Sequence, residues 1–165
     1  MRDIAQAAQM LPGSLYYHFS AKEDLLVAVY EEGVRRISQG ARSAVLARTE
    51  PWDRLEAAAV AHLEALLGGS DYAQVVIRIM PKDVPKVASR LIRLRDGYER
   101  LFAELIAALP LAKETDRRML RLMLLGALNW AQSWFRIDGK ATPRSVARSF
   151  MKLLRDAQFL KEQAR

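Results

Sequence analysis

The segment from Ser14 to His18 carries the side chains best suited to contact a phosphate or the edge of a base. A hydroxyl group (Ser14), two phenols (Tyr16 and Tyr17) and an imidazole (His18) occur within this short stretch. Hydroxyl and imidazole groups bind phosphate oxygens, which fixes the register of a protein on nucleic acid. The small residues Gly13 and Ser14 permit a close approach to base edges. The pattern indicates that one short segment binds DNA.

Two short helices are expected to position these side chains. The sequence predicts a helix over residues 2–9, a turn over 10–13 that contains Pro and Gly, and a second helix over 14–19. Ala5 and Ala8 are small enough to let the two helices cross closely. This arrangement is a helix-turn-helix, whose second helix enters the major groove.

A long third helix is expected to follow directly. Ser20 and Glu23 have the spacing of a capping box, which predicts a helix that starts after Ser20 and continues to about Arg48. Lys22 lies in its first turn and is placed to reach a further phosphate. This helix follows directly on the predicted helix pair over residues 2–19, here called the reader. Any movement of the long helix would therefore also move the reader.

The reader segment resembles the DNA-binding signature of TetR-type transcriptional regulators. The residues that carry the resemblance are Ile4-Ala5, Leu11-Pro12-Gly13-Ser14-Leu15-Tyr16-Tyr17-His18-Phe19, Lys22 and Leu25-Leu26. The resemblance implies base contacts around residues 12–14 and phosphate contacts from the aromatic residues and the lysine. The DNA-binding residues that it implies are Pro12, Gly13, Ser14, Tyr16, Tyr17, His18 and Lys22. The alternative is an aromatic packing cluster in an unrelated helical protein.

Two features depart from the family pattern. Gln9 stands where family members usually have a glycine. Either Gln9 adopts a backbone conformation that is less favourable for a residue with a side chain, or the turn is longer than in the family. The family also has an amphipathic helix before the position of Met1, and this first helix of the DNA-binding domain is absent from the chain. A second reading is therefore a shortened ligand-binding dimer that does not bind DNA itself.

The charge of the chain does not by itself point to DNA. The net charge is +7, but residues 1–42 contain five basic and five acidic side chains, so the excess lies outside the reader. The chain has no long uncharged apolar run and no signal peptide, and we expect a cytoplasmic protein. Its lack of cysteine is compatible with a reducing compartment.

Catalysis is the rival class of function, and the chain offers little material for it. It has two histidines that are far apart, no cysteine, no Gly-rich phosphate loop and no nucleophile elbow. No metal-ligand spacing surrounds either histidine. We expect a protein that is not an enzyme and that has neither a metal nor a cofactor.

The periodicity of the whole chain predicts an all-α fold. Apolar residues recur with helical spacing, and no stretch alternates long enough for a strand. The sequence predicts an incomplete helix-turn-helix region with its connecting helix over residues 1–42, and a ligand-binding and dimerisation domain over 43–165. The further helices that we expect there are 51–67, 70–80, 83–109, 114–137 and 143–163.

The helix predicted over residues 114–137 is apolar on nearly all sides. Such a helix must be buried all round, which a small domain rarely achieves alone. We expect one face inside the protein and the other on a second subunit, with Gly126 allowing close approach, so that two helices of each chain form a four-helix bundle in the dimer. A central helix of a monomeric bundle is the alternative.

An effector cavity is expected among these helices. The run Leu125-Gly126-Ala127-Leu128-Asn129-Trp130 resembles the penultimate helix of TetR-type regulators that respond to acyl-CoA thioesters. Apolar walls with a few polar groups suit an acyl or aromatic ligand. The ligand-binding residues that we predict are His62, Leu66, Tyr72, Val76, Tyr98, Phe102, Met123, Asn129 and Trp130. His62 has the alternative of a partly exposed or backbone-bonded histidine, and Asn129 that of a hydrogen bond across the dimer.

Two basic stripes occur in the chain, and only the first has two interpretations. The run of basic residues from Arg78 to Arg95 forms either a solvated helix face or contacts with the phosphates of a CoA-like ligand. The stripe on the last helix (Arg144, Arg148, Lys152 and Arg155) is expected to be a solvated face beside the dimer contact. The partners that the sequence predicts are therefore palindromic operator DNA, a second copy of the chain and a small effector, and the function predicted is that of a repressor released by this effector.

Overall fold

The computed structural model describes the backbone of residues 1–163 and the side chains of residues 1–157. Over these residues the secondary structure is helical and contains no strand, which confirms the all-α prediction. The elements are α1 (Arg2–Ala7), α2 (Pro12–His18), α3 (Lys22–Leu46), α4 (Pro51–Leu67), α5 (Asp71–Arg78), η1 (Pro81–Asp83), α6 (Ala88–Ala107), α7 (Arg117–Trp130), η2 (Ala131–Ser133) and α8 (Pro143–Gln163). None of the described helices is both long enough and apolar enough to cross a membrane.

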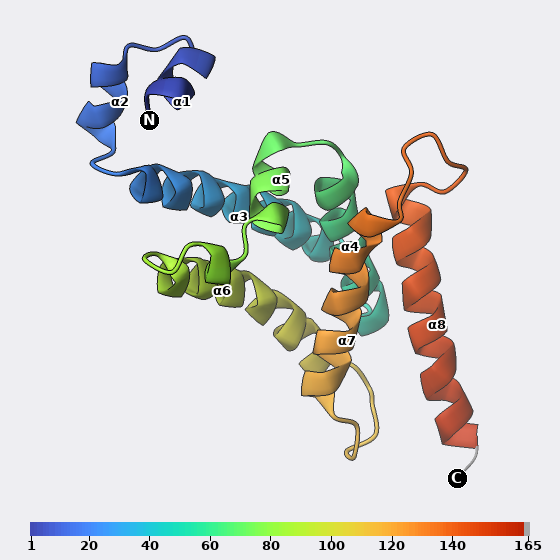
Figure 1. The fold of residues 1–165 in the computed structure, drawn as a ribbon. Helices are drawn as coiled ribbons and strands as arrows, with labels where there is room; N and C mark the ends of the chain where they lie inside the picture. The colour runs from blue at the N-terminus through green and yellow to red at the C-terminus, as the bar shows by residue number, and fades with distance from the viewer. Residues whose placement is uncertain (164–165) are drawn as a thin grey trace.

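Helix α3 connects two parts of the molecule (Figure 1). The pair α1 and α2 lies at its N-terminal end, apart from the remaining helices; α5 and α6 lie along α3, and α4, α7 and α8 gather toward its C-terminal end. Helices α4, α5 and α6 all pack on α3, whereas α8 packs along α4. One continuous helix, α3, thus joins the reader (α1 and α2) to the helices α4 to α8.

The start of α3 differs from the predicted capping box. Ala21 is the N-cap residue, and no side chain caps the helix. The hydroxyl of Ser20 lies one position too early and donates instead to the carboxylate of Asp24, at 2.7 Å. The prediction of a capping box was therefore wrong, although the helix begins within two residues of the expected position.

Two predicted helices are shorter in the structure. The helix expected from Asp83 begins only at Ala88, because Pro81 and Pro85 disfavour α-helix in the segment before it. The helix expected over 114–137 starts at Arg117, where Asp116 caps it by accepting from the backbone N–H of Met119. Beyond residue 130 the helix gives way to the short η2 turn.

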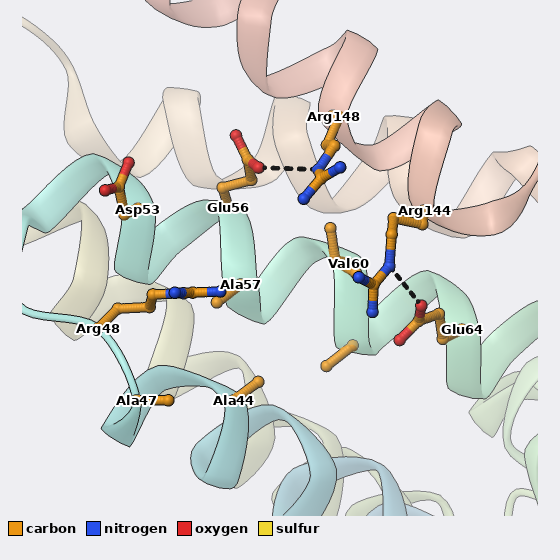
Figure 2. A pocket seen from close by; sticks show the side chains of 11 residues that line it. Ala44, Ala47, Arg48, Asp53, Glu56, Ala57, Val60, Glu64, Arg144 and Arg148 are labelled. Carbon is orange, nitrogen blue, oxygen red and sulfur yellow. Dashed lines mark hydrogen bonds and ion pairs between the residues drawn. The ribbon is translucent and has the colours of Figure 1, made fainter.

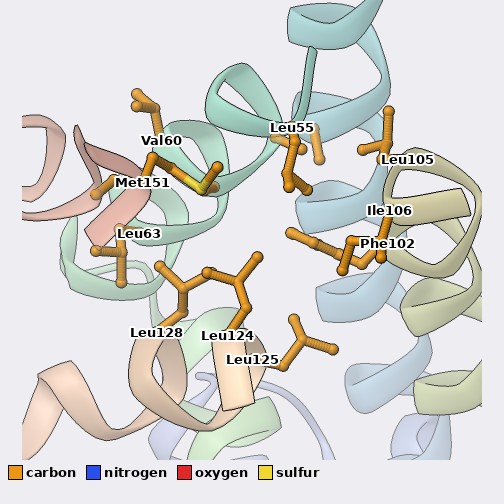
Figure 3. Close-up of a cluster of buried hydrophobic side chains, with 14 of the residues drawn as sticks. Leu55, Val60, Leu63, Phe102, Leu105, Ile106, Leu124, Leu125, Leu128 and Met151 are labelled. Atoms are coloured by element: carbon orange, nitrogen blue, oxygen red, sulfur yellow. The ribbon is translucent and has the colours of Figure 1, made fainter. Parts of the chain in front are cut away.

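The core lies where α4, α6, α7 and α8 meet (Figure 3). Leu55 and Leu63 of α4 face Phe102 of α6 and Leu128 of α7, and all four side chains are fully buried. Met151 of α8 closes this core from the other side. Burial of large apolar side chains is the main force that holds these helices together.

A ladder of ion pairs joins α4 to α8 beside the core (Figure 2). Arg144 lies 3.0 Å from Glu64 and Arg148 lies 3.2 Å from Glu56. Farther along, Arg155 lies 4.0 Å from Asp53. The basic stripe predicted to be only a solvated face is thus partly engaged with α4, although exposed pairs of this kind add little stability each.

Candidate functional site

The residues predicted to contact DNA form an exposed surface at the tip of the molecule. All seven, from Pro12 to Lys22, are exposed. Ala5 of α1 and Leu15 of α2 are the buried residues of these two helices, which pack against each other. Ala8 is exposed, and its predicted role at the helix crossing was wrong because α1 ends at Ala7.

The turn between α1 and α2 carries the strain that the sequence predicts. Gln9 has a φ of +55° and is the only non-glycine residue with a positive φ among the residues that the structure describes. An L-residue in this left-handed region is less stable than glycine. The missing glycine is therefore accommodated by strain and not by a longer turn.

Two ion pairs attach the start of α3 to the start of α6. Lys86 lies 3.0 Å from Glu23, and Arg90 lies 3.5 Å from Asp24. The hydrogen bond from Lys86 lowers the pKa of the Glu23 carboxyl. These contacts involve two members of the basic run in the middle of the chain, which the sequence left as either a solvated face or a ligand contact.

A cavity of about 420 Å³ lies between α3, α4, α5, α6 and α7. Six of the predicted ligand-binding residues line it together, namely His62, Leu66, Val76, Tyr98, Asn129 and Trp130. The sequence reading missed the contribution of α3, from which Tyr30, Val34 and Ile37 line the same cavity. The helical spacing of these three residues is the signal that would have identified them.

The other three predicted residues do not line this cavity. The ring of Tyr72 stacks beneath the guanidinium of Arg36, at 4.3 Å. Phe102 is fully buried in the core and supports the rings of His62 and Tyr98 edge-on. Met123 is exposed on the outer face of α7.

A hydrogen-bonded chain of three side chains crosses one wall of the cavity. The Nδ1 atom of His62 lies 2.8 Å from the Tyr98 hydroxyl, and its Nε2 atom lies 3.1 Å from the Asn129 Oδ1 atom. Because an amide oxygen only accepts, Nε2 carries the proton, and Nδ1 accepts from the tyrosine. Burial lowers the pKa of His62 to about 4, so the imidazole is neutral near pH 7.

The charged groups of the cavity wall are paired with one another. Arg95 lies 3.5 Å from Glu99 and 3.1 Å from Asp96. Glu99 also lies 3.7 Å from Arg121. The positive charge of Arg95 in the cavity wall is therefore already compensated by neighbouring carboxylates.

Sequence comparisons agree with the two-part architecture. A family model described as "Tetracyclin repressor-like, C-terminal domain" matches residues 48–157, and one described as "Bacterial regulatory proteins, tetR family" matches residues 1–29. The chain belongs to the TetR family. Membership in the TetR family of transcriptional regulators confirms the predicted class and excludes the rival class of enzymes. Helix α3 spans the predicted domain boundary at residues 42 and 43, so this boundary stays a prediction.

Individual relatives in the TetR family resemble different extents of the chain. The HTH-type transcriptional repressor KstR2 of Mycobacterium tuberculosis is 35% identical over 77 residues, which are 47% of this chain and 38% of that repressor. The chain thus matches well under half the length of this relative.

Solved structures of similar fold cover nearly the whole chain. The crystal structure of superantigen PfiT has 27% identity and a TM-score of 0.77, covering 92% of this chain and 82% of that one. The structure of AibR in complex with isovaleryl coenzyme A and operator DNA has 21% identity and a TM-score of 0.76, covering 92% and 84%. At this identity the second likeness concerns the fold alone.

Proposed function

We propose that this TetR-family protein is a repressor that binds palindromic operator DNA as a dimer and releases it when the cavity takes up a small apolar effector. The observation that carries the proposal is that one helix serves both sites. Helix α3 begins directly after the exposed reader helix, and its residues Tyr30, Val34 and Ile37 line the cavity. A ligand that favours one position of α3 thereby favours one spacing of the two reader helices.

An acyl-CoA-like effector fits the cavity and its rim. The lining is largely apolar, and its volume is in the range of small-molecule sites. Met80 and Pro81 form part of the rim, and Arg78 and Lys82 flank them in the sequence, where they are placed to meet phosphates. The AibR structure, which contains isovaleryl coenzyme A, supports this ligand class by analogy of fold.

The dimer contact is proposed for the outer faces of α7 and α8. Met119, Leu122 and Met123 are exposed on α7, and Leu153 is 68% exposed on α8. No atom lies within 4 Å of the position that a Cβ of Gly126 would take; this exposed glycine also lines the cavity, so the open space there adjoins both the cavity and the proposed contact. An apolar face of this extent favours a protein contact over exposure to water.

The second candidate is a ligand-binding dimer that does not bind DNA. It is favoured by the reader itself, in which Met10 and Leu11 are exposed and Gln9 is strained. Exposed apolar residues beside the recognition helix indicate a reader that α1 alone supports only in part. Binding to DNA decides between the two candidates.

The deciding experiment selects DNA from a random duplex pool with the wild-type protein and measures its affinity at several salt concentrations. We expect a palindromic site with half-sites about one helical turn apart, or a multiple of it. Tyr17→Ala should weaken binding without changing the mass of the dimer. Lys22→Ala should reduce the dependence of log K on log salt by about one phosphate contact.

Lys140→Ala is the matched control, because this lysine is also exposed but lies in the loop before α8. It should leave both the affinity and the salt dependence unchanged. A protein that forms the dimer but enriches no DNA at low salt would establish the second candidate instead.

A further inference from the structure

The side-chain amide of Asn129 is held in one orientation. The Nε2–H group of His62 donates to its Oδ1 atom at 3.1 Å, and the Tyr98 hydroxyl holds His62 from the other side. With Oδ1 so engaged, the Nδ2 group of Asn129 is left to donate elsewhere. It forms no hydrogen bond with any residue that the structure describes, and Asn129, itself an exposed residue, lines the open side of the cavity.

Tyr30 offers a second unused polar group in the same cavity. The residue is 3% exposed, and its hydroxyl forms no hydrogen bond within the described part of the chain. No fully buried polar side-chain atom of the described residues lacks a partner, so this oxygen opens onto the cavity that the residue lines. An unpaired donor in such a place is satisfied only by a ligand or by water.

The cavity offers no free positive charge to complement these donors. His62 is neutral, and Arg95 is paired with Asp96 and Glu99. Asn129 is exposed in the single chain, so a carboxylate gives up part of its hydration only as its alkyl chain enters the cavity, and it gains no cation in return. A neutral carbonyl oxygen would accept from the free donor at a much smaller cost of desolvation.

We propose that Asn129 makes the cavity selective for an uncharged carbonyl group, as in an acyl ester, thioester or ketone, over the carboxylate of the corresponding free acid. The Nδ2 group donates to the carbonyl oxygen, and His62 is the positioning residue that keeps this group turned toward the ligand. The inference rests on the proposed role of the cavity as an effector site. The inference adds that the protein senses the esterified or otherwise uncharged form of an acyl compound and not the free acid.

The test measures calorimetric affinities of the full chain for 2-nonanone and for octanoate near neutral pH. Because an apolar cavity prefers the ketone in any case, the informative quantity is the ratio of the two affinities in each variant. Asn129→Leu should weaken binding of 2-nonanone about tenfold and change octanoate little, so that the ratio falls by about the same factor. Gln132→Leu is the matched control, an amide of the same cavity wall that is not held by His62, and it should preserve the ratio.

The position of the imidazole proton gives a readout that does not depend on mutation. Nitrogen NMR of the wild-type protein should find His62 neutral and protonated at Nε2. A proton at Nδ1 would mean that Asn129 turns its oxygen toward the cavity, and this would overturn the inference.

Failure of the inference can be told from failure of the proposed cavity. If both probes bind, and Val76→Trp abolishes binding by filling the cavity, an unchanged ratio in Asn129→Leu overturns the carbonyl selectivity alone. If neither probe binds to the wild type, the cavity is not an acyl-effector site, and the inference falls with it.

Discussion

The Nδ1 atom of His62 lies 2.8 Å from the hydroxyl oxygen of Tyr98, although the two residues are 36 positions apart in the chain. Their rings stack with an angle of 8° between the planes, so that α4 and α6 meet through this pair at the wall of the cavity. His62 is buried and its other ring nitrogen donates to Asn129. The Tyr98 hydroxyl therefore supplies the hydrogen bond that the remaining acceptor of the ring, Nδ1 of His62, requires.

Removing this hydroxyl should destabilise the protein, whereas removing the hydroxyl of Tyr30, which opens onto the cavity, should not. Tyr98→Phe leaves Nδ1 of His62 buried without a donor, and we expect the free energy of unfolding to fall by about 1–3 kcal/mol. Tyr30→Phe removes a hydroxyl that bonds to no described residue, and the change should stay within about 0.5 kcal/mol. Urea denaturation of both variants measures the difference, and equal losses would contradict the hydrogen-bond assignment.

His62 should also make the stability depend on pH. Its pKa is about 4 in the folded protein and about 6.5 in an unfolded chain, because burial disfavours the charged ring. Below about pH 6.5 the unfolded state takes up a proton that the folded state does not take up until about pH 4. Stability is thus lost as the pH falls through this window, by up to about 3 kcal/mol, and is unaffected above it.

Urea titrations at about pH 7 and about pH 5 test this dependence. His62→Gln should lose part of the difference between the two pH values, while carboxylates that titrate in both proteins cancel in the comparison. A pH dependence that survives in His62→Gln would assign the effect to other groups.

Two glycines of α3 should respond in opposite ways to the same substitution. A Cβ at Gly33 would lie 2.7 Å from Cγ2 of Val76 and 2.9 Å from the carbonyl oxygen of Tyr72, so α5 must shift. Gly33→Ala should cost about 1–3 kcal/mol of stability. At Gly40 nothing lies within 4 Å, and Gly40→Ala should add about 0.5–1 kcal/mol through helix propensity.

Urea denaturation compares the two variants directly. Because α5 supplies Val76 to the cavity wall, Gly33→Ala should also weaken binding of 2-nonanone, while Gly40→Ala should not. A stabilising effect of Gly33→Ala would show that α5 is not held closely against α3.

The proposed dimer face predicts a change in mass from one charged substitution. Leu153→Glu places a carboxylate on the apolar face of α8, and we expect the protein to become monomeric at micromolar concentration. Leu46→Glu is the control, since Leu46 is 84% exposed at the end of α3, away from that face. Native mass spectrometry gives both masses, and a dimer that tolerates Leu153→Glu would move the contact elsewhere.

Local sequence signals predicted the residues at which several helices begin. Pro51 and the pair Thr142-Pro143 predicted the starts of α4 and α8 correctly, because proline at a first helical position and a hydroxyl cap act within a few residues. The signal failed at Ser20, because the helix starts one residue later, with Ala21 at the N-cap position and no side-chain cap. The strain at Gln9 was predictable for the same local reason.

The sequence by itself determined the family, the all-α class and the exposed reader, since a short run of residues with fixed spacing carries each of them. It also marked His62 and Asn129 as polar groups on apolar faces. Only the tertiary structure decided that these two residues share a hydrogen bond with each other and reach Tyr98 through the same ring. The reason is physical: the three side chains come from α4, α6 and α7, and the packing of those helices around a common core, which no local pattern encodes, sets the distances between them.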